Sequence, residues 1–426
     1  MNLNLIFTKT KKRFRELWNY KIFKYSIIIH SLYILICSIL IIFWFQDFSD
    51  FKVFYKATEV FLTDITDLYN RMNYPYPYRY FPLSVIIFIP FYFMGFDIGF
   101  IMFTLFNLFL NILISVIVYK IVMLIRGEDH EKGDKRIIHY ICLYAIGLPQ
   151  ISNYFLGQNN LIITFLIVLS LLIYLRKKDL KWQFVASLLI GISIVVKPIT
   201  ITLIPFLLLV NVDLRRKIFK IDFIKSLIRV LGCLTPLALN LIYFFLFPKL
   251  WEAFLLTNFT GVEPVDINFS FSVSKIIINF YYFIGVPYNQ VLILFVVLLI
   301  FGGLGFLIYV FRRFSKHALI YGYTLGILIT LIVYFDTWDH HLLNLTPLLL
   351  IILFNLPRNS KIAKRFIKPS FIFFNFFNLV FMGLFVLFKD IFPLNFIPML
   401  FLLLVFYGIA RYCIIQQNSN NASEIS

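Results

Sequence analysis

The stretch SIIIHSLYILICSILIIFWFQ, residues 26–46, decides the class of fold, because it is a continuous apolar run without a formal charge. A helix needs about 20 apolar residues to cross the roughly 30 Å hydrocarbon core of a bilayer. The sequence DFSD, residues 47–50, follows immediately and adds two carboxylates. The stretch therefore predicts a membrane-spanning helix with acidic side chains just beyond its end.

The composition of the whole chain is also that of a membrane protein. The 426 residues are 61% hydrophobic, 19% aromatic and 14% charged, and the mean hydropathy is +0.88. Soluble domains have about 45–50% apolar and about 25% charged residues, so a water-soluble protein is excluded, and so is a disordered chain. Strands of an outer-membrane barrel alternate over about ten residues, whereas these apolar runs are continuous. The sequence predicts an all-α polytopic membrane protein.

About twelve windows are long and apolar enough to cross the membrane. We expect spans near 26–46, 98–124, 138–154, 158–175, 183–197, 199–212, 226–248, 288–311, 317–335, 341–356, 369–388 and 394–413. The two spans between 183 and 212 are short and could tilt or form a broken hairpin. Segment 81–95 is also apolar, but Pro82 and Pro90 interrupt it, so we expect an interfacial or re-entrant piece. Residues 1–414 are expected to form one transmembrane domain, and residues 415–426 a disordered cytoplasmic tail.

The distribution of basic residues predicts the orientation. The net charge is +18, and on this layout 31 of the 39 Lys and Arg residues lie on the side of the termini and 8 on the other. Cytoplasmic loops of membrane proteins are enriched in Lys and Arg. We therefore expect a multi-pass protein of the cell membrane with both termini in the cytoplasm. The same rule explains the basic charge without a nucleic-acid partner. The four cysteines lie inside apolar runs without C-x-x-C spacing, which argues against disulfide or metal chemistry.

Three segments on the opposite, outer face are candidates for function, since loops on a rigid scaffold usually carry it. They are residues 46–80, 249–287 and 335–341. An amphipathic stretch at 51–62 predicts a juxtamembrane helix with Phe51, Phe54, Val60 and Phe61 toward lipid or protein. Lys197 ends a span, where a charge is costly. It is either a functional group or a side chain that snorkels to the headgroups.

An ordered series of short motifs runs through these segments. It consists of Asp50-Phe51, Tyr55-Lys56-Ala57, Asp67-Leu68-Tyr69, Tyr78-Arg79-Tyr80-Phe81-Pro82, Pro90, Pro149, Gly157-Gln158-Asn159-Asn160, Lys197-Pro198, Trp338-Asp339-His340-His341 and Pro347. In this order the series resembles glycosyltransferase family 87 over roughly residues 47–350. The chain departs from the family pattern in lacking a glycine before Asp67-Leu68-Tyr69 and in having Leu83 after Pro82.

The resemblance implies a GT-C fold and an enzyme that uses a polyprenyl-phosphate sugar at the extracytoplasmic face. It favours mannose as the sugar but leaves arabinose and other sugars open. The acceptor could be a glycolipid, a lipid-linked glycan or a protein. The partners are then these lipids and the surrounding membrane. The resemblance implies no nucleotide sugar and a catalytic carboxylate in the first outer loop.

Glycosyl transfer from a lipid phosphate needs a base for the acceptor hydroxyl and positive charge or donors for the departing phosphate. Asp50 is the expected base, and Asp47, one turn earlier on the same helical face, is the alternative. Inversion follows if no protein nucleophile intervenes. Both carboxylates could also be solvated groups at the end of the span.

The remaining candidates fall into two groups. Those expected to bind the donor phosphate are Lys197, Arg79, His340 and His341, and those expected to bind sugar or acceptor are Gln158, Asn159, Asn160, Tyr69, Tyr80 and Trp338. Two of the asparagines could instead cap a helix, and interfacial tyrosines commonly form an aromatic belt. Neighbouring residues on a helix point about 100° apart, so we do not expect Asp336, Asp339 and the histidines to bind a metal. No cofactor is expected.

Two other functions fit a chain with about twelve spans. One is a secondary transporter or a flippase for a lipid-linked glycan, which would place its polar groups near the bilayer midplane. The other is a noncatalytic subunit of a glycan-assembly machine. Clustering of Asp50, Lys197 and His340 at the outer end would favour the transferase, whereas scattering along a central path would favour transport.

Overall fold

The computed structural model describes residues 13–127, 135–213, 217–260, 270–312, 317–387 and 396–415. Its α-helices are α2 (Lys21–Phe43), α3 (Asp50–Thr63), α4 (Ile89–Tyr92), α5 (Phe96–Arg126), α6 (Arg136–Ala145), α7 (Pro149–Leu156), α8 (Asn160–Arg176), α9 (Leu180–Val196), α10 (Phe223–Leu246), α11 (Pro248–Leu255), α12 (Val273–Phe283), α13 (Gln290–Val310), α14 (Ala318–Val333), α15 (Thr346–Asn355), α16 (Lys368–Ile372), α17 (Asn378–Leu387) and α18 (Phe396–Ile415).

Shorter elements connect these helices. The 3₁₀-helices are η1 (Gln46–Phe48), η2 (Ile65–Asp67), η3 (Arg71–Asn73), η4 (Pro82–Ile87), η6 (Pro198–Leu207) and η8 (Asp339–Asn344). The π-helical turns are η7 (Leu256–Thr260), η9 (Ala363–Ile367) and η10 (Phe373–Phe377). The strands β1 (Val210–Asp213) and β2 (Ile218–Ile221) form an antiparallel hairpin.

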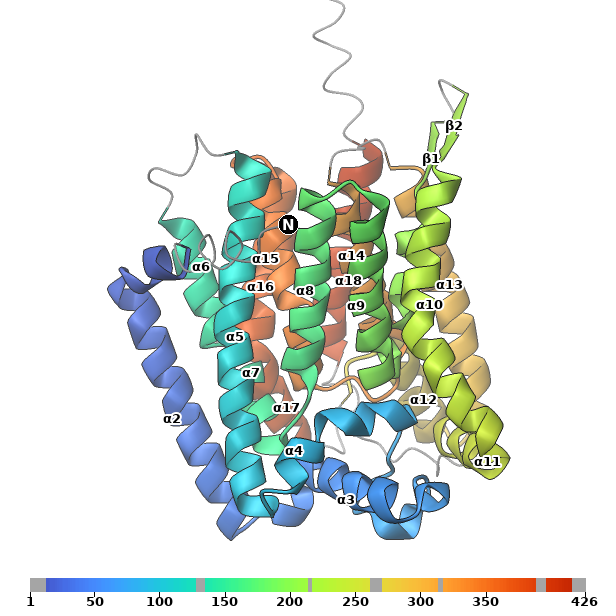
Figure 1. The fold of residues 1–426 in the computed structure, drawn as a ribbon. Coiled ribbons are helices and arrows are strands. Elements are labelled where there is room, and N and C mark those ends of the chain that lie inside the picture. Colours follow the sequence, from blue (N-terminus) through green and yellow to red (C-terminus); the bar gives the residue numbers. More distant parts are fainter. Residues whose placement is uncertain are drawn as a thin grey trace, which may run out of the picture.

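The helices form one bundle whose long axes run roughly parallel (Figure 1). Within the described residues, six helical segments are long and apolar enough to cross a membrane, at Lys21–Phe43, Phe96–Arg126, Phe223–Leu246, Gln290–Val310, Ala363–Leu384 and Ile397–Ile414. The apolar helices α8, α9 and α14 and the 3₁₀-helix η6 are shorter. The expectation of a polytopic, mostly helical membrane protein is confirmed. The count of twelve spans and the GT-C fold stay predictions.

Several predicted spans differ from single α-helices. The window 138–154 is divided into α6 and α7, and 341–356 into η8 and α15. The window 199–212 is not a continuous α-helix, because it contains η6 and the beginning of β1. Pro198 begins η6 and Pro205 lies inside it, and proline lacks the N–H that a continuous α-helix requires. The hairpin that follows, with Val210 opposite Ile221, is a small addition to an otherwise helical bundle.

Close packing of α9 and α10 brings one side of the bundle together. A Cβ at Gly191 would lie 2.1 Å from the carbonyl oxygen of Cys233, so no larger residue fits there without movement. Helices in membranes commonly meet at small residues because these allow the backbones to approach. The remaining face of α10 carries exposed leucine and isoleucine side chains, as expected for a helix in contact with lipid.

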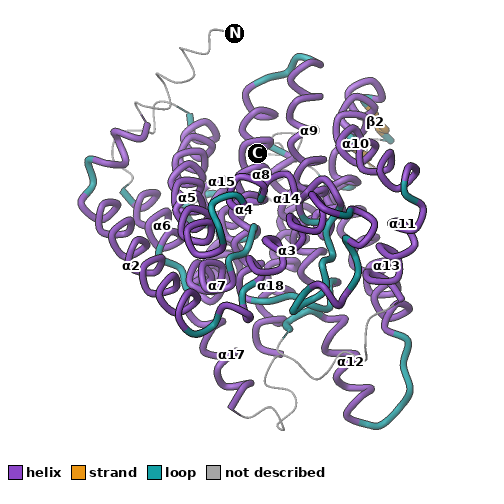
Figure 2. The backbone as a smooth tube through the Cα atoms, turned by 60° about the horizontal axis from the view of Figure 1, so that its bottom comes forward, coloured by secondary structure: helices purple, strands orange, loops and turns teal. Residues whose placement is uncertain are grey.

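A layer of short elements covers one end of the bundle, which we call the α3 end. Figure 1 shows α3 and α4 there, and in Figure 2, where this end comes forward, they lie over the middle of the bundle. Segment 81–95 forms η4 and α4, which stay at this end of the bundle before α5 begins. Its placement as an interfacial or re-entrant piece stays a prediction. Asn240 of α10 holds this segment, because its Oδ1 accepts a 3.0 Å hydrogen bond from the Leu83 N–H.

The opposite end of the bundle is basic. It contains the turn between α8 and α9, the β1–β2 hairpin and the connection from α15 to α16 (Figure 1). The described basic residues of these connections are Arg176, Lys177, Lys178, Lys181, Lys217, Lys220, Lys225, Arg358, Lys361 and Lys364. We call this the basic end. The predicted tail, apart from Ile415, and residues 261–269 of the second outer segment lie outside the described residues.

Candidate active site

The first turn of α3 places Asp50 against the loop between α7 and α8. Ser49 caps α3 by accepting a 3.1 Å hydrogen bond from the Phe51 N–H, and its hydroxyl donates to the Leu156 carbonyl at 3.0 Å. Gly157 follows Leu156 with φ of +65°, and a Cβ there would lie 2.6 Å from Cβ of Phe51. Both the left-handed backbone and the close approach therefore require glycine.

The two candidate bases have different surroundings. Asp50 begins α3 and is half-buried, whereas Asp47 lies in the separate 3₁₀-helix η1 and is exposed. They do not share one helical face, which corrects the expectation from their spacing, because the chain turns at Ser49, whose backbone is extended (φ −88°, ψ 130°). The helix predicted at 51–62 is present as α3, and its Phe51 and Phe54 pack into the protein core. Its position at the membrane surface stays a prediction.

Asp50 is joined to Lys197 through the side-chain amide of Gln158. The Gln158 Nε2 donates a short hydrogen bond to the Asp50 carboxylate, and its Oε1 accepts from Lys197 Nζ at 3.4 Å. Lys197 Nζ donates a shorter bond of 2.7 Å to Oδ1 of Asn160. A carboxylate and an ammonium group therefore share one cluster, with neutral amides between them.

Lys197 is held inside the protein. Its side chain is 4% exposed, so the alternative that it snorkels to the headgroups is wrong. The neighbouring Asn159 donates to the Val196 carbonyl at 3.3 Å and fixes the end of α9 from which Lys197 extends. Asn160 also contacts Asn344, the last residue of η8, with 3.4 Å between Asn344 Nδ2 and Asn160 Oδ1. The loop at 157–160 thus connects α3, α9 and η8.

Burial changes the acidity of the proposed base. It raises the pKa of Asp50 to about 6, while the hydrogen bond from Gln158 and the positive charge of Lys197 act in the opposite direction. The side chains of Tyr80 and Tyr334 also interact electrostatically with Asp50. A carboxylate with a pKa near neutral can accept a proton effectively at physiological pH.

His340 and His341 lie together in η8, with ring centroids 4.3 Å apart. Burial lowers the pKa of both imidazoles, and the charge of Lys197 lowers each further. The Nδ1 of His341 accepts a 3.0 Å hydrogen bond from the Trp338 N–H, so this ring is neutral with its proton on Nε2. It can donate a hydrogen bond from Nε2 but cannot act there as a base.

Arg79 connects the first outer loop to the turn before η8. Its Nη1 lies 2.7 Å from Oδ2 of Asp336, and both side chains remain partly exposed. The ion pair occupies part of the guanidinium group. The predicted contact of Arg79 with a donor phosphate stays a prediction, while its described partner indicates that it also holds the two segments together.

The aromatic candidates differ in accessibility. Tyr69 is 5% exposed, and its hydroxyl donates to the Tyr80 carbonyl at 2.7 Å, so it forms part of the packed loop. Tyr80 and Trp338 are half-buried. The structure brings Asp50, Gln158, Asn160 and Lys197 into one hydrogen-bonded cluster, whereas sugar contacts by Gln158, Asn159, Asn160, Tyr69, Tyr80 and Trp338 stay predictions.

In the sequence, Asn344 was missed and Asp339 was considered only as a metal ligand. Asn344 joins the cluster through Asn160, and Asp339 accepts from Ser152 and Asn378 at 3.0 and 2.6 Å. Burial raises the pKa of Asp339 to about 6, and the two hydrogen bonds oppose this shift. A polar residue inside an apolar run, such as Asn344 in LLNLTPLLL, was the available signal.

Metal binding has no suitable cluster in the described part of the chain, which holds no group of three or more His, Cys, Asp or Glu side chains placed around one point. Asp336 is engaged by Arg79, and Asp339 by Ser152 and Asn378. These contacts direct both carboxylates away from a shared ion. The expectation of a metal-independent reaction stays an expectation.

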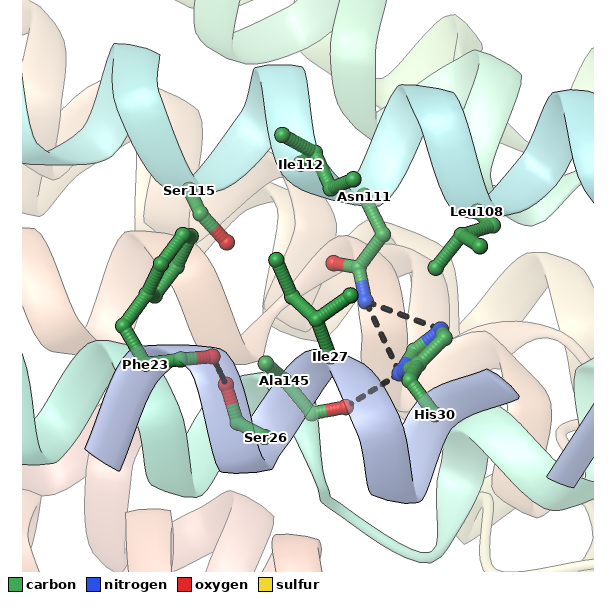
Figure 3. Close-up of a pocket in the computed structure, with 9 residues that line it drawn as sticks. All are labelled: Phe23, Ser26, Ile27, His30, Leu108, Asn111, Ile112, Ser115 and Ala145. Carbon is green, nitrogen blue, oxygen red and sulfur yellow. Dashed lines mark hydrogen bonds between the residues drawn. The ribbon is translucent and has the colours of Figure 1, made fainter. Parts of the chain in front are cut away.

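A second buried polar group joins α2 to its neighbours (Figure 3). His30 Nδ1 lies 2.7 Å from the Ala145 carbonyl, and Asn111 Nδ2 lies 3.1 Å from His30 Nε2. His30 Nε2 also contacts the Tyr154 hydroxyl, three residues before Gly157. The cavity beside these groups has a volume of about 10 Å³, room for about one water molecule. This group supports the helix that leads into the loop at 157–160.

Comparison with known families gives one match. The model of glycosyltransferase family 87 matches residues 78–334. This range includes Gln158, Asn160 and Lys197 but ends before the two histidines and begins after Asp50. A search of curated proteins and a search of solved structures found no match.

Proposed function

Because the chain belongs to glycosyltransferase family 87 and is therefore a glycosyltransferase of the membrane, we propose that it transfers a sugar from a polyprenyl-phosphate donor. The proposed sugar is mannose and the acceptor a glycolipid or lipid-linked glycan. The reaction takes place at the extracytoplasmic face, at the α3 end of the bundle, and inverts the anomeric centre. The proposal includes a GT-C fold with about twelve spans.

The observation that carries this proposal is the hydrogen-bonded series Asp50–Gln158–Lys197–Asn160. In the proposed reaction the acceptor hydroxyl oxygen attacks the anomeric carbon of the donor. Its proton passes to the Asp50 carboxylate. The bond between that carbon and the phosphate oxygen breaks, and its electron pair leaves with the phosphate. One displacement without an enzyme nucleophile inverts the configuration.

Lys197 and the imidazoles fit the charge that develops on the leaving group. Amide oxygens, and not a carboxylate, contact the Lys197 ammonium group, so its positive charge remains available to an anion. A sugar linked through one lipid phosphate carries one negative charge, which one ammonium group balances. Neutral imidazole N–H groups and Arg79 can then stabilise the second charge that forms on departure. This balance favours a monophosphate donor over a nucleotide diphosphate sugar.

Transport is the main competing function. The polar side chains of the Asp50 cluster, however, gather at the α3 end. The part of the bundle next to them is packed with apolar side chains. On α8, Asn160 and Thr164 are followed by the fully buried Ile167, Val168 and Leu171. Such packing does not resemble the polar midplane site of a secondary transporter, so this arrangement supports the transferase.

The substitution Asp50→Asn tests the proposal directly. Asparagine can still accept the hydrogen bond from Gln158 but cannot take up a proton, so we expect donor binding to remain and turnover to fall by about 100-fold or more. The measurement is transfer from radiolabelled polyprenyl-phosphate sugars by the purified protein in lipid vesicles.

Asp47→Asn is the matched control, because this carboxylate is exposed and three residues away. If Asp47→Asn abolishes transfer and Asp50→Asn does not, Asp47 is the base. If neither change affects transfer, carboxylate catalysis at this site is wrong. An Asp50→Asn protein that complements a null strain fully would support the noncatalytic assembly subunit.

A further inference from the structure

Asp339 is a buried carboxylate that the proposed reaction does not use. Its side chain is 1% exposed. Oδ1 accepts from Asn378 Nδ2 at 2.6 Å, and Oδ2 accepts from Ser152 Oγ at 3.0 Å. Both oxygens are therefore engaged by neutral donors inside the protein, and an acceptor hydroxyl has no approach to them. This geometry excludes Asp339 as a second base and indicates a different role.

The two hydrogen bonds join three elements that are far apart in the sequence. Ser152 lies on α7, the helix that leads into Gly157 and Gln158. Asp339 is the first residue of η8, directly before His340 and His341, and Asn378 is the first residue of α17. One carboxylate thus fixes the start of the histidine turn against α7 on one side and α17 on the other.

A second contact between the same elements supports this arrangement. The π-helical turn η10 precedes Asn378 and packs against η8. Its Asn375 carbonyl accepts a 2.7 Å hydrogen bond from the Leu148 N–H, in the break between α6 and α7. A π-helical turn frees a carbonyl from the regular helical pattern. Helix α17 is therefore attached to both α7 and η8, although it lies beyond the residues that the family model matches.

We propose that Asp339, held by Ser152 and Asn378, is the positioning residue that sets the place of the His340–His341 turn beside Lys197. The role as a support for catalysis rests on the proposed transfer reaction. The placement of the turn does not depend on that reaction. In this proposal, helix α17 contributes to the structure of the active site through Asn378.

An exchange of the two partners tests the pair. Asp339→Asn removes the charged acceptor, and Asn378→Asp places two carboxylates in contact. Each change alone should therefore weaken the hydrogen bond between positions 339 and 378. The double variant Asp339→Asn with Asn378→Asp restores an amide–carboxylate pair with its direction reversed. Asp179→Asn is the control, because Asp179 is an exposed carboxylate at the basic end.

Two readouts on the full-length protein in lipid vesicles separate positioning from folding. The first is the rate at which diethyl pyrocarbonate modifies His340, followed by mass spectrometry. His340 is 4% exposed, so displacement of η8 should increase its modification at least threefold in each single variant. The second is transfer kinetics, in which kcat should fall by about tenfold or more while KM for the acceptor changes little. The double variant should recover both values to within about threefold of the wild type.

Unchanged modification of His340 in both single variants would overturn the proposal, and so would a double variant no better than the singles. If the single variants fail to fold, recovery of folding and His340 protection in the double variant supports the pair, and failure to recover contradicts it. A wild-type protein without transfer activity would overturn the proposed function alone, since the modification of His340 still decides the placement of the turn.

Discussion

At the scale of single residues, the central feature is the amide group between opposite charges. Gln158 donates to Asp50 and accepts from Lys197, so neither charge is neutralised by direct contact with the other. A direct ion pair would lower the pKa of the carboxylate, which would make it a poorer base. The separation instead leaves burial as the dominant influence, and the pKa of Asp50 is raised to about 6.

This raised pKa predicts the pH dependence of transfer. The base form of Asp50 is the deprotonated form, so activity should increase about tenfold per pH unit between pH 4.5 and 6. The measurement is kcat/KM for transfer between pH 4.5 and 8. A profile that is already level at pH 4.5 would contradict the assignment. Since the pKa of Asp339 is also raised to about 6, Asp339→Asn serves as the control, and its residual activity should keep the same midpoint.

The same shift has a consequence for stability. The folded protein binds the Asp50 proton more tightly than the unfolded chain, for which the ordinary pKa is 3.8. Stability therefore decreases as the pH rises from about 4 to about 6 through this group. An uncharged amide at position 50 avoids the burial of a charge, so loss of turnover in Asp50→Asn is not expected to reflect unfolding.

At the scale of elements, the junction between α7 and α8 determines the site. Gly157 allows α3 to approach closely enough for Asp50 to meet Gln158. The change Gly157→Ala would force Cβ against Phe51 and impose a left-handed backbone on alanine. We expect a loss of about 1–3 kcal/mol in the free energy of unfolding and at least tenfold slower transfer, because the contact of Asp50 with Gln158 would be lost.

Gly285→Ala separates the effect of backbone strain from the effect of the steric clash with Phe51. Gly285 has a φ of +67°, but nothing lies within 4 Å of the position that a Cβ would take there, so alanine has the backbone strain without the clash. Thermal unfolding and transfer rate should be measured for both variants. Gly285→Ala should be mildly destabilised with normal transfer. Equal effects of both changes on transfer would show that the packing of α3 on Gly157 is unimportant.

The elements also show what the sequence could and could not predict. The length of the apolar runs alone predicts helices α2, α5, α10, α13 and α18, because a continuous helix satisfies all its backbone hydrogen bonds within the lipid. The divisions between α6 and α7 and between η8 and α15 depend on tertiary contacts, such as the bond from Leu148 to Asn375. Pro198 and Pro205 indicated a break in the α-helical pattern at η6. The window was nevertheless predicted as a span because of its apolar composition.

The site followed from the sequence to a similar extent. The motif series placed Asp50, Gln158 and Lys197 together, and the structure joins them through hydrogen bonds. The contacts of Ser152 and Asn378 with Asp339 could not be foreseen, since these residues are 187 and 39 positions away from it. Contacts between residues so far apart leave no pattern of spacing in the sequence, so a single sequence cannot predict them.

At the scale of the whole molecule, the basic connections and the candidate active site lie at opposite ends of the bundle. The α3 end holds the Asp50 cluster, and the basic end holds the lysine- and arginine-rich connections (Figure 1). Positive charges stay on the cytoplasmic side of membrane proteins. Helices of the bundle link the two ends, so a basic end in the cytoplasm would place the proposed binding site for the donor lipid on the opposite side of the membrane.

This orientation predicts which positions a membrane-impermeant maleimide can reach. All four native cysteines are buried, so the background should be low. Met72 is 91% exposed in the first outer segment, and Lys178 is exposed in the turn between α8 and α9 at the basic end. In intact cells Met72→Cys should react and Lys178→Cys should react only after permeabilisation. The wild-type chain is the control for background labelling. The reverse pattern would place the Asp50 cluster on the cytoplasmic side, where a cytoplasmic sugar donor would have to replace the extracytoplasmic one, whereas labelling of both sites in intact cells would contradict a membrane between them.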